Sequence, residues 1–534
     1  MDKTIKVLAV DDENYMLKIL KACMPSPAFD LTACSDAMTA MSVFKKGAFD
    51  ILLLDVVMPG IDGFELHSLI RNVNAAVPIV MLTAKIDDVN GTMLKRISSD
   101  KNTYYQSKSF TKEELVAKII DIVNKMKLER EKKSYFEEME KDIALAGEVQ
   151  RSMFPNWDTT LDTMRSRFYY RPYMKITGDI YSIMRLSYNM FLCILGDISG
   201  HGIQAALCMS AIQYSLARFI RNFPEEAAKP HKVLNHLQDF MTGIVPDRYM
   251  TCLVSIIDFN NNTVCYQNAG HPDFVMYSRS MGFIPTNPES KGALPVGLFP
   301  TSNYKESENV LIGFPEDAVL FAYTDGLTDI QNVVGRTYNS DPLREFVETF
   351  SKDTVTSSSV FRIMDALFKL GFNDVRDDIS IAAISRNVQR ENCYEFSIKP
   401  MISDVDHFAQ KISRLTLDKT KDEMLAAKIE ILLSEFLNNV VVHGLGNKNS
   451  QRPIIAARIE FGKKNILLTF CDKGKKWDMN AYNFDDGASD ILNYTRATSG
   501  RGLSLIKKIT SSVRRSRYAD TLNETIFTVE YGNS

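Results

Sequence analysis

Acidic residues stand beside glycine turns and strand ends in four separate stretches of the sequence. Asp197 lies in GDISGHG, Asp179 in ITGDIY and Asp325 in FAYTDG, while Asp377 and Asp378 precede the apolar run ISIAAI. Turns and strand ends let the backbone present each carboxylate to a shared point. Carboxylates without a histidine or cysteine cluster favour Mg²⁺ or Mn²⁺ over zinc. Two such ions about 3.5–4 Å apart bind a hydroxide and a phosphoryl oxygen, so the set predicts metal-assisted phosphoester hydrolysis.

The stretch GDISGHG taken alone allows two other interpretations. A glycine-rich turn before a helix can hold a phosphate on backbone N–H groups, but the spacing of known phosphate loops is missing and an acid stands where the anion would lie. The other is a tight turn with Ser199 as helix N-cap. His201, and His271 in NAGHPD, stay open. Either one shuttles a proton to a leaving serine oxygen or, as we favour, both bond backbone carbonyls.

A second set of polar residues follows the apolar runs of the first 110 residues. Asp11 and Asp12 come after KVLAV, Asp55 ends ILLLD, Thr83 ends IVMLT and Lys108 follows TYYQ. The carboxyl ends of parallel strands converge on one crevice. Crowded carboxylates there require a divalent cation, and Mg²⁺ has the matching oxygen preference. Turn formation explains any one of these acids but not the set.

A third set lies in the helical pattern AAKIEILLSEFLNNVVVHG. Glu435, Asn439 and His443 are spaced i, i+4 and i+8, which places them on one face of an α-helix. Polar side chains on so apolar a helix must be hydrogen-bonded or functional. Asp472 follows the strand-like NILLTFC. Three glycines provide turns or a helix start where a phosphate could approach: Gly474, Gly500 and Gly502.

The elements that must position these residues indicate several folded units. At roughly 100–200 residues per domain, 534 residues predict three or four. Apolar runs alternate with helical patterns in the first 122 residues, which is typical of a parallel sheet with crossover helices. Residues 123–155 favour one long helix that either pairs with a second copy as a coiled coil or docks as a stalk. Residues 156–390 predict sheets covered by helices, and 391–534 a last unit.

Composition narrows the class of protein. A net charge of −3 provides no overall attraction to nucleic acid or to an anionic membrane. The short basic cluster Arg514, Arg515 and Arg517 predicts a solvated helix end or strand edge. The eight cysteines show no CxxC pair, which favours a reducing compartment. No apolar run approaches the ~18 residues of a membrane helix. We therefore expect a cytoplasmic protein.

Residues 1–122 resemble the receiver domain of two-component response regulators, and so imply a flavodoxin-like fold. By this resemblance Asp11 and Asp12 hold Mg²⁺ and Asp55, within LLLDVVMPGIDG, accepts a phosphoryl group from a histidine kinase. Three residues complete the implied switch: Thr83, Lys108 and Tyr105. Ser109 departs from the family pattern because SKSF replaces Lys-Pro-Phe, which would loosen the loop after the lysine.

Residues 156–390 carry, in family order, motifs of the metal-dependent serine/threonine phosphatases of the sporulation-phosphatase E type. The motifs are LAGEVQRSMFP (just before this range), GDISGHG, RYMT, NAGHPD, LPVG, YTDGLTD and DDIS. The resemblance implies a PP2C-like αββα sandwich with two Mn²⁺ or Mg²⁺ ions. It assigns the metal ligands as Asp179, Asp197, the carbonyl of Ile198, Asp325, Asp377 and Asp378. Thr177 and Ser182 in TGDIYS depart from the pattern and imply a lower metal affinity.

Residues 391–534 resemble the Bergerat-fold ATPases shared by histidine kinases and anti-sigma-factor serine kinases. The resemblance implies ATP with Mg²⁺ on Asn439, adenine on Asp472, and Glu435 as the base for a serine hydroxyl. It also implies that Gly474, Gly500 and Gly502 approach the nucleotide, while the role of His443 stays open. Lys476 replaces the second glycine of Asp-x-Gly-x-Gly. A histidine kinase needs a phosphoacceptor helix pair before this unit, and residues 391–425 contain only His407.

Together these resemblances predict a response regulator with phosphatase and serine kinase domains. We expect both to act on a STAS-type anti-sigma-factor antagonist, in partner switching with a sigma factor. The alternative is a C-terminal domain that only binds the antagonist or a sigma factor. Nucleic acid and membrane are not expected partners, and a homodimer through the linker helix is compatible with the sequence.

Overall fold

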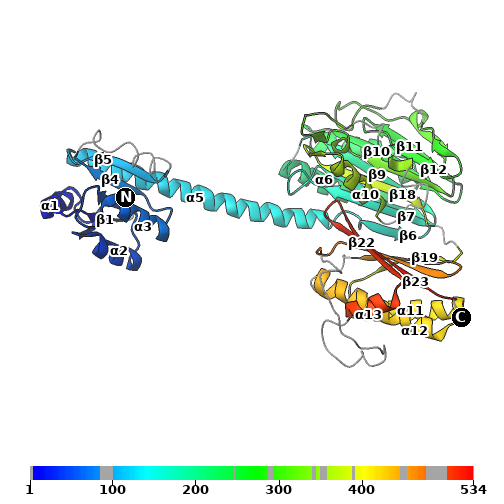
Figure 1. Cartoon of the computed structure of the whole chain (residues 1–534). Helices are drawn as coiled ribbons and strands as arrows, with labels where there is room; N and C mark the ends of the chain where they lie inside the picture. Colours follow the sequence, from blue (N-terminus) through cyan, green and yellow to red (C-terminus); the bar gives the residue numbers. More distant parts are fainter. Residues whose placement is uncertain are drawn as a thin grey trace. The chain divides into compact units, whose positions relative to one another are not determined.

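The computed structural model describes residues 4–84, 100–200, 202–245, 247–286, 293–338, 344, 346–348, 358–387, 391–445, 454–476 and 502–532. The chain divides into two compact units, residues 1–142 and 143–534. One continuous helix, α5 (Lys112–Arg151), contributes residues to both (Figure 1). None of the described helices combines the length and apolar composition needed to cross a bilayer.

The first unit holds a parallel sheet with strand order β2-β1-β3-β4-β5, the flavodoxin-like order predicted from the sequence. Its strands are β1 (Ile5–Val10), β2 (Phe29–Cys34), β3 (Ile51–Asp55), β4 (Ile79–Thr83) and β5 (Thr103–Ser107). Strands β3 and β4 are buried along their whole length because helices cover both faces. Helices α1 (Asn14–Cys23) and α5 pack on one face, and α2 (Ala37–Lys46) and α3 (Gly63–Val73) on the other.

The second unit begins with the predicted two-sheet sandwich. The strand orders are β14-β11-β10-β9-β8 and β13-β12-β15-β18-β7-β6. The first sheet comprises β8 (Asp179–Ser187), β9 (Met190–Ile198), β10 (Met250–Asp258), β11 (Thr263–Ala269) and β14 (Val310–Gly313). The second comprises β6 (Asp158–Leu161), β7 (Met164–Arg171), β12 (Val275–Ser278), β13 (Gly282–Ile284), β15 (Ala318–Tyr323) and β18 (Ile379–Arg386).

Helices cover the outer faces of this sandwich. The helices α6 (Ile203–Asn222), α7 (Pro224–Ala227) and α8 (Pro230–Ile244) share a core with the first sheet, and α10 (Ser359–Lys369) packs on the second. Helix α6 buries Ala205, Met209, Ile212 and Leu216, the three- and four-residue spacing of one helical face. Short elements complete this part: η2 (Glu306–Glu308), η3 (Asp325–Leu327), β16 (Gln331–Asn332) and β17 (Phe372–Asp374).

The C-terminal part of the second unit is one antiparallel sheet, with strand order β19-β20-β21-β23-β22. Its strands are β19 (Cys393–Ile398), β20 (Ile455–Phe461), β21 (Asn465–Asp472), β22 (Ser512–Tyr518) and β23 (Leu522–Glu530). Helices α11 (Ile402–Thr420), α12 (Glu423–Asn439) and α13 (Gly502–Ile509) cover one face (Figure 1). Side chains from the other face, among them Ala456 and Cys471, join the hydrophobic cluster of α10. Both faces of this sheet are therefore covered.

Candidate functional site

The predicted phosphatase ligands come from the two sheets of the sandwich. Strands β8 and β9 pair so that Asp179 lies directly opposite Asp197. In the other sheet, Asp325 follows the end of β15, and Asp377 precedes its neighbour β18. The backbone joins these two strands at this point, since the N–H of residue 324 donates to the carbonyl of Ser380 at 3.1 Å. The fold thus gathers residues from distant stretches of the sequence.

Hydroxyl groups from the second sheet hold Asp179 of the first. Its Oδ2 accepts hydrogen bonds from Ser380 Oγ at 2.6 Å and from Thr324 Oγ1 at 3.1 Å. Its Oδ1 is buried and has no hydrogen-bond partner among the residues that the structure describes. A buried carboxylate oxygen without a donor fits a metal cation, which would replace the missing partner.

The carboxylates also repel one another. Burial and the neighbouring Asp197 raise the pKa of Asp179 well above its usual range. Burial, together with Asp325, Asp377 and Asp378, raises the pKa of Asp197 to about 8. Like charges brought together out of water stay ionised only with a compensating cation. The unpartnered oxygen and the raised pKa values therefore both fit divalent ions at this site.

Asp378 is engaged differently from the other acids. Its Oδ1 accepts from the backbone N–H of Tyr173 at 2.7 Å and its Oδ2 from that of Gly178 at 2.9 Å. Both carboxylate oxygens thus fix the loop that leads into Asp179. A metal-binding role for Asp378 stays a prediction, and the loop contacts provide it with another function.

The last turn of α5 packs on the same loop. The Gln150 side-chain amide donates to the carbonyl of Thr177 at 2.8 Å and accepts from its N–H at 3.0 Å. At Gly147 a Cβ atom would lie 2.2 Å from the carbonyl oxygen of Lys175, so only glycine allows this approach. Thr177 Oγ1 in turn accepts from the N–H of Asp179 at 2.9 Å. Sequence reasoning missed Gln150, although a glutamine on the apolar side of LAGEVQRSMF was a signal.

The structure describes only one of the two histidines whose roles the sequence left open. His201 lies outside the described residues. His271 is only 6% exposed, and its Nδ1 lies 3.0 Å from Thr251 Oγ1. Burial lowers the pKa of its imidazole to about 3. A neutral, buried ring favours the structural interpretation of His271 over a proton shuttle.

The receiver residues converge as predicted. Asp11, Asp12 and Asp55 each offer an oxygen, and these three oxygens lie within 4.8 Å of one another. Lys108 Nζ lies 2.9 Å from Asp11 Oδ2 and 2.9 Å from Asp55 Oδ2. The carbonyl of Thr83 accepts from the Lys108 N–H at 2.7 Å. Burial raises the pKa of Asp55 against the opposing effect of Lys108, and the oxygen-rich cluster fits Mg²⁺.

Within the described residues, the predicted switch residue Tyr105 is held by its backbone and not by its hydroxyl. The Tyr105 hydroxyl is buried without a hydrogen-bond partner in the described part of the chain, and Lys118 of α5 donates to its backbone carbonyl. Ser109, the departure from the family pattern, lies in a turn where its Oγ is 2.7 Å from Ser107 Oγ. The turn is therefore held by hydroxyl contacts in place of the usual proline.

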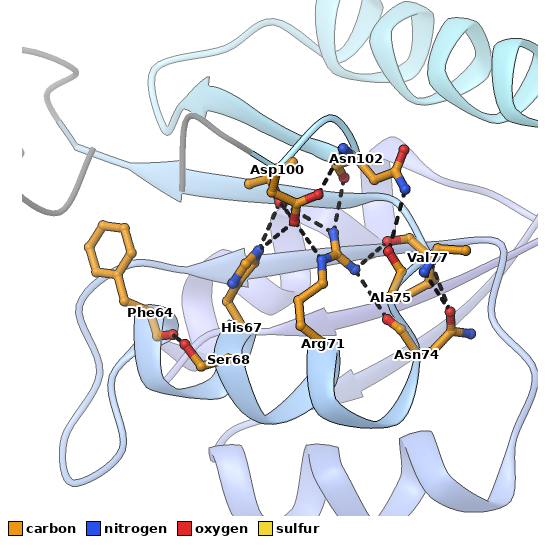
Figure 2. Close-up of polar contacts among 11 residues, drawn as sticks. Phe64, His67, Ser68, Arg71, Asn74, Ala75, Val77, Asp100 and Asn102 are labelled. Atoms are coloured by element: carbon orange, nitrogen blue, oxygen red, sulfur yellow. Dashed lines mark hydrogen bonds and ion pairs between the residues drawn. The ribbon is translucent and has the colours of Figure 1, made fainter. Parts of the chain in front are cut away.

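An ion pair that sequence reasoning missed anchors the start of β5 to α3 (Figure 2). Asp100 Oδ2 accepts from Arg71 Nε at 2.5 Å and from Thr103 Oγ1 at 2.6 Å, and lies 3.1 Å from His67 Nε2. Although burial opposes it, the Thr103 hydroxyl and the Arg71 guanidinium lower the pKa of Asp100 to about 2. The cluster fixes the strand that carries Tyr105.

In the C-terminal part, the polar residues of α12 fall at its end. Glu435 is exposed and Asn439 is half-buried. The helix then changes to a π-helical turn, η4 (Val440–Gly444), which contains His443. The α-helical spacing therefore ends at Asn439, and His443, which is exposed, lies in the π turn that follows, so its place on the face of Glu435 and Asn439 stays a prediction.

The turn after β21 closes against the end of η4. Asp472 is 1% exposed, and its Oδ1 accepts from the Gly474 N–H at 2.8 Å and from Asn523 Nδ2 at 2.9 Å. Its Oδ2 has no hydrogen bond to any described residue, which suits a nucleobase amino group. The Lys475 N–H donates to the carbonyl of Gly444 at 2.9 Å, which joins the two predicted nucleotide segments. Gly500 lies outside the described residues, and Gly502 begins α13.

The basic cluster Arg514, Arg515 and Arg517 lies on the edge strand β22. A strand edge was one of the two placements predicted from the sequence. Arg514 is exposed, but Arg517 Nη1 donates to Asn523 Oδ1 at 2.7 Å and to the carbonyl of Gly474 at 3.1 Å. Arg515 Nη2 lies 3.8 Å from Asp472 Oδ2. The prediction of a solvated cluster was wrong for Arg515 and Arg517, because alternate residues of the strand point toward the turn after β21.

Comparisons with known proteins match three families in succession. The response regulator receiver domain matches residues 7–120, stage II sporulation protein E residues 189–387, and the histidine kinase-like ATPase domain residues 401–529. The phosphoserine phosphatase RsbU of Bacillus subtilis is 24% identical over 257 residues, which cover 47% of this chain and 72% of RsbU.

Other relatives cover smaller shares of sequence or resemble only the fold. The DNA-binding response regulator MtrA of Mycobacterium tuberculosis is 32% identical over 114 residues, 21% of this chain, and the chain spans 48% of the length of MtrA. The crystal structure of the RsbU and RsbW domains of Rv1364c from Mycobacterium tuberculosis has 18% identity, covers 69% of this chain and 93% of its own, and has a TM-score of 0.36. The SiaA-PP2C domain of Pseudomonas aeruginosa has 17% identity, 47% and 98% coverage and a TM-score of 0.41.

Proposed function

We propose that this chain, in which a response regulator receiver domain, a SpoIIE-type phosphatase domain and a histidine kinase-like ATPase domain follow one another, is a phosphorylation-controlled protein serine/threonine phosphatase. The observation that carries the proposal is a group of carboxylates from both sheets that repel one another, although the described residues place three ligand oxygens within 4.8 Å of one another only at Asp11, Asp12 and Asp55. In the group from both sheets, Asp179 offers a buried unpartnered oxygen, and Asp197 has a pKa raised to about 8. Such a set is suited to divalent ions and hence to phosphoester hydrolysis.

The residues of the chain have separate tasks in this reaction. Asp179, Asp197 and the carbonyl of Ile198 would bind metal from the first sheet, and Asp325 and Asp377 from the second. When bound, divalent ions polarise the phosphoryl group and lower the pKa of the attacking water. Thr324 and Ser380 orient Asp179 so that its Oδ1 stays available for binding. We propose that the native ions are Mn²⁺ or Mg²⁺.

Helix α5 provides the route for control. Gln150 holds both backbone polar groups of Thr177, two residues before Asp179. A histidine kinase would phosphorylate Asp55, where Lys108 and a Mg²⁺ ion held by Asp11 and Asp12 would bind the phosphoryl group. A change at the start of α5 could then reach the metal site through its last turn. In our proposal, phosphorylation of Asp55 raises phosphatase activity.

The C-terminal domain is proposed to bind ATP with Mg²⁺ and to phosphorylate a serine of the same substrate. Glu435 would act as the base, Asn439 would hold Mg²⁺ and Asp472 would bind the adenine. Nucleotide binding is supported by Asp472 Oδ2, which has no hydrogen bond to a described residue, although Arg515 lies 3.8 Å away. Lys476 in place of a glycine favours the second candidate, a domain that only sequesters the antagonist or a sigma factor.

The proposed substrate is a STAS-type anti-sigma-factor antagonist in the cytoplasm. The test of the phosphatase is to incubate the phosphorylated antagonist with the full chain and Mn²⁺. We expect phosphate release that Asp197→Asn abolishes, and no release from either protein would contradict the proposal. The test of the kinase is transfer of labelled γ-phosphate from ATP to the antagonist. Transfer abolished by Glu435→Gln supports a kinase, whereas nucleotide binding without transfer supports sequestration.

A further inference from the structure

An arginine outside the predicted ligand set holds the turn that follows Asp197. Arg248, in RYMT, donates through Nη1 to the carbonyl of Ser199 and through Nη2 to Gln204 Oε1 at 2.6 Å. Ser199 belongs to the turn after β9, and Gln204 to the first turn of α6. One guanidinium thus ties the turn after β9 to the first turn of α6. A planar fork with several donors is suited to bridging two acceptors in this way.

The backbone next to Arg248 makes a second attachment to the same turn. The Tyr249 N–H donates to Ser199 Oγ at 3.1 Å, and the Ser199 N–H donates to the Tyr249 carbonyl at 2.8 Å. The N-cap of α6 is Gly202, so the alternative in which Ser199 caps this helix was wrong. The Ser199 side chain instead extends the pairing of β9 with β10, in which Thr251 lies opposite Asp197.

Gly200 provides the space that Arg248 needs. It has a φ of +84°, a conformation that L side chains rarely adopt. A Cβ atom at this position would lie 2.0 Å from Arg248 Nη1. A side chain at position 200 would therefore both strain the backbone and displace the guanidinium. The guanidinium of Arg248 therefore fits against this turn because position 200 has no side chain.

We infer that Arg248 is a positioning residue for the metal pair, an inference that rests on the proposed phosphatase function. The turn it holds follows two of the proposed ligands, the Asp197 carboxylate and the Ile198 carbonyl. Fixing the next carbonyl, that of Ser199, restricts the rotation of the peptide that carries the Ile198 oxygen. Arg248 thereby keeps both ligands in place, and its loss weakens metal binding before it weakens substrate binding.

The test measures Mn²⁺ binding directly, by electron paramagnetic resonance of free Mn²⁺ in titrations of the full chain. Binding that remains in Asp197→Asn identifies the other metal sites and is subtracted. For Arg248→Ala we expect a loss of about 10- to 100-fold in affinity at the phosphatase site, the range found when residues that orient metal ligands are removed. Arg248→Lys keeps the charge but lacks the planar fork whose two nitrogens reach the separate acceptors, and we expect a similar loss. Added guanidinium should restore part of the affinity in Arg248→Ala.

The matched control is Arg185→Ala on β8, the strand that begins with Asp179. Arg185 is about half exposed and pairs with Asp162 at 3.0 Å, away from the turn. We expect its Mn²⁺ affinity to be unchanged. If Arg248→Ala does not fold, as judged by thermal unfolding without metal, Gln204→Leu removes one of the two acceptors and should weaken Mn²⁺ binding by a smaller factor.

Activity measurements separate the possible outcomes. With phosphoprotein substrate, Arg248→Ala should raise the half-saturating Mn²⁺ concentration and leave KM for the phosphoprotein unchanged at saturating Mn²⁺. A raised KM with unchanged Mn²⁺ affinity would mean that Arg248 contacts the substrate, and unchanged values of both would mean that it has no role; either result overturns the inference. If the unmodified protein binds Mn²⁺ in an Asp197-dependent way but releases no phosphate, the proposed function fails while the binding test of Arg248 still holds.

Discussion

At the scale of single residues, the raised pKa of Asp197 predicts that metal binding is linked to proton release. Burial and three neighbouring carboxylates raise this pKa to about 8, so the metal-free protein holds a proton there at pH 7. Metal must displace that proton, and because the pKa of Asp179 is raised as well, affinity should rise by at least about tenfold per pH unit between pH 6 and 8. Mn²⁺ titrations across this range, with proton release measured in weak buffer, check the prediction. Affinity that does not change with pH contradicts it.

His271 makes a separate prediction about stability. Its folded-state pKa of about 3 lies below the ~6.5 of an unfolded histidine, so only the unfolded chain takes up a proton between these values. Stability should therefore be lost as the pH falls below ~6.5, by about 1.4 kcal/mol per unit. We expect His271→Gln to show less loss of melting temperature between pH 7.5 and 5.5 than the unmodified protein. The exposed His407→Gln is the control and should behave as the unmodified protein does.

The residues that sequence could identify are those whose chemistry is visible without the fold. Asp179, Asp197 and Asp325 stand out as a set, because turn formation explains a single acid beside a glycine but not several with the same metal-binding chemistry. Thr324 and Ser380 do not, because their hydroxyl groups matter only once β15 and β18 are known to be neighbours. Asp378 is the opposite case. It also stands beside a strand end, but both of its carboxylate oxygens accept hydrogen bonds from backbone N–H groups.

At the scale of elements, the exposed side of α5 predicts self-association. Several large apolar side chains of this helix are exposed, and three of them fall on the a and d positions of one heptad register: Leu128, Tyr135 and Met139. A heptad repeat of apolar residues is typical of a coiled coil. We expect the full chain to dimerise in analytical ultracentrifugation and Tyr135→Glu to shift it toward monomer. Arg130→Glu, an exposed change outside the repeat, is the control, and equal effects of both changes contradict a specific seam.

The last turn of α5 makes a second prediction at this scale. Gln150→Ala leaves the buried N–H and carbonyl of Thr177 without partners, at a cost of about 1–3 kcal/mol for each unsatisfied group. The loop before Asp179 should loosen, so that phosphatase kcat falls and no longer responds to phosphorylation of Asp55. Steady-state assays with and without a small-molecule phosphodonor measure this. The exposed Glu148→Ala is the control, and a retained response in Gln150→Ala contradicts the proposed route.

At the scale of the whole molecule, the order of the three domains and the class of each fold were predictable. Local alternation of strands and helices predicted the parallel sheet of the first domain and the covered sheets of the second, whereas the sandwich of the second and the fold of the third followed from motif resemblances. The packing of the last sheet against α10 was not predictable. Strand β21 has apolar side chains on both faces, Leu468 and Phe470 on one and Cys471 on the other. Such a strand must be covered on both faces, but the sequence does not identify the element that packs on the second face.

The contact between the phosphatase and ATPase domains makes the last prediction. Arg165 of β7 is 2% exposed and pairs with Asp158 at 2.7 Å and with Glu395 of β19. Removing one partner of a buried ion group leaves a charge without compensation, which typically costs about 3–5 kcal/mol. Since Asp158 remains, we expect Glu395→Ala to fall at the lower end of that range.

Calorimetry of the full chain measures this effect. If the shared interface makes the two domains unfold together, Glu395→Ala should lower the temperature of their common transition or split it in two. Glu460→Ala is the matched control, because Glu460 is a partly exposed acid of the same sheet whose partner, Arg458, is also near Glu395. Equal shifts for the two variants would mean that the ion pair across the interface contributes nothing beyond surface charge. A split transition would mean that this contact holds the two domains in one cooperative unit.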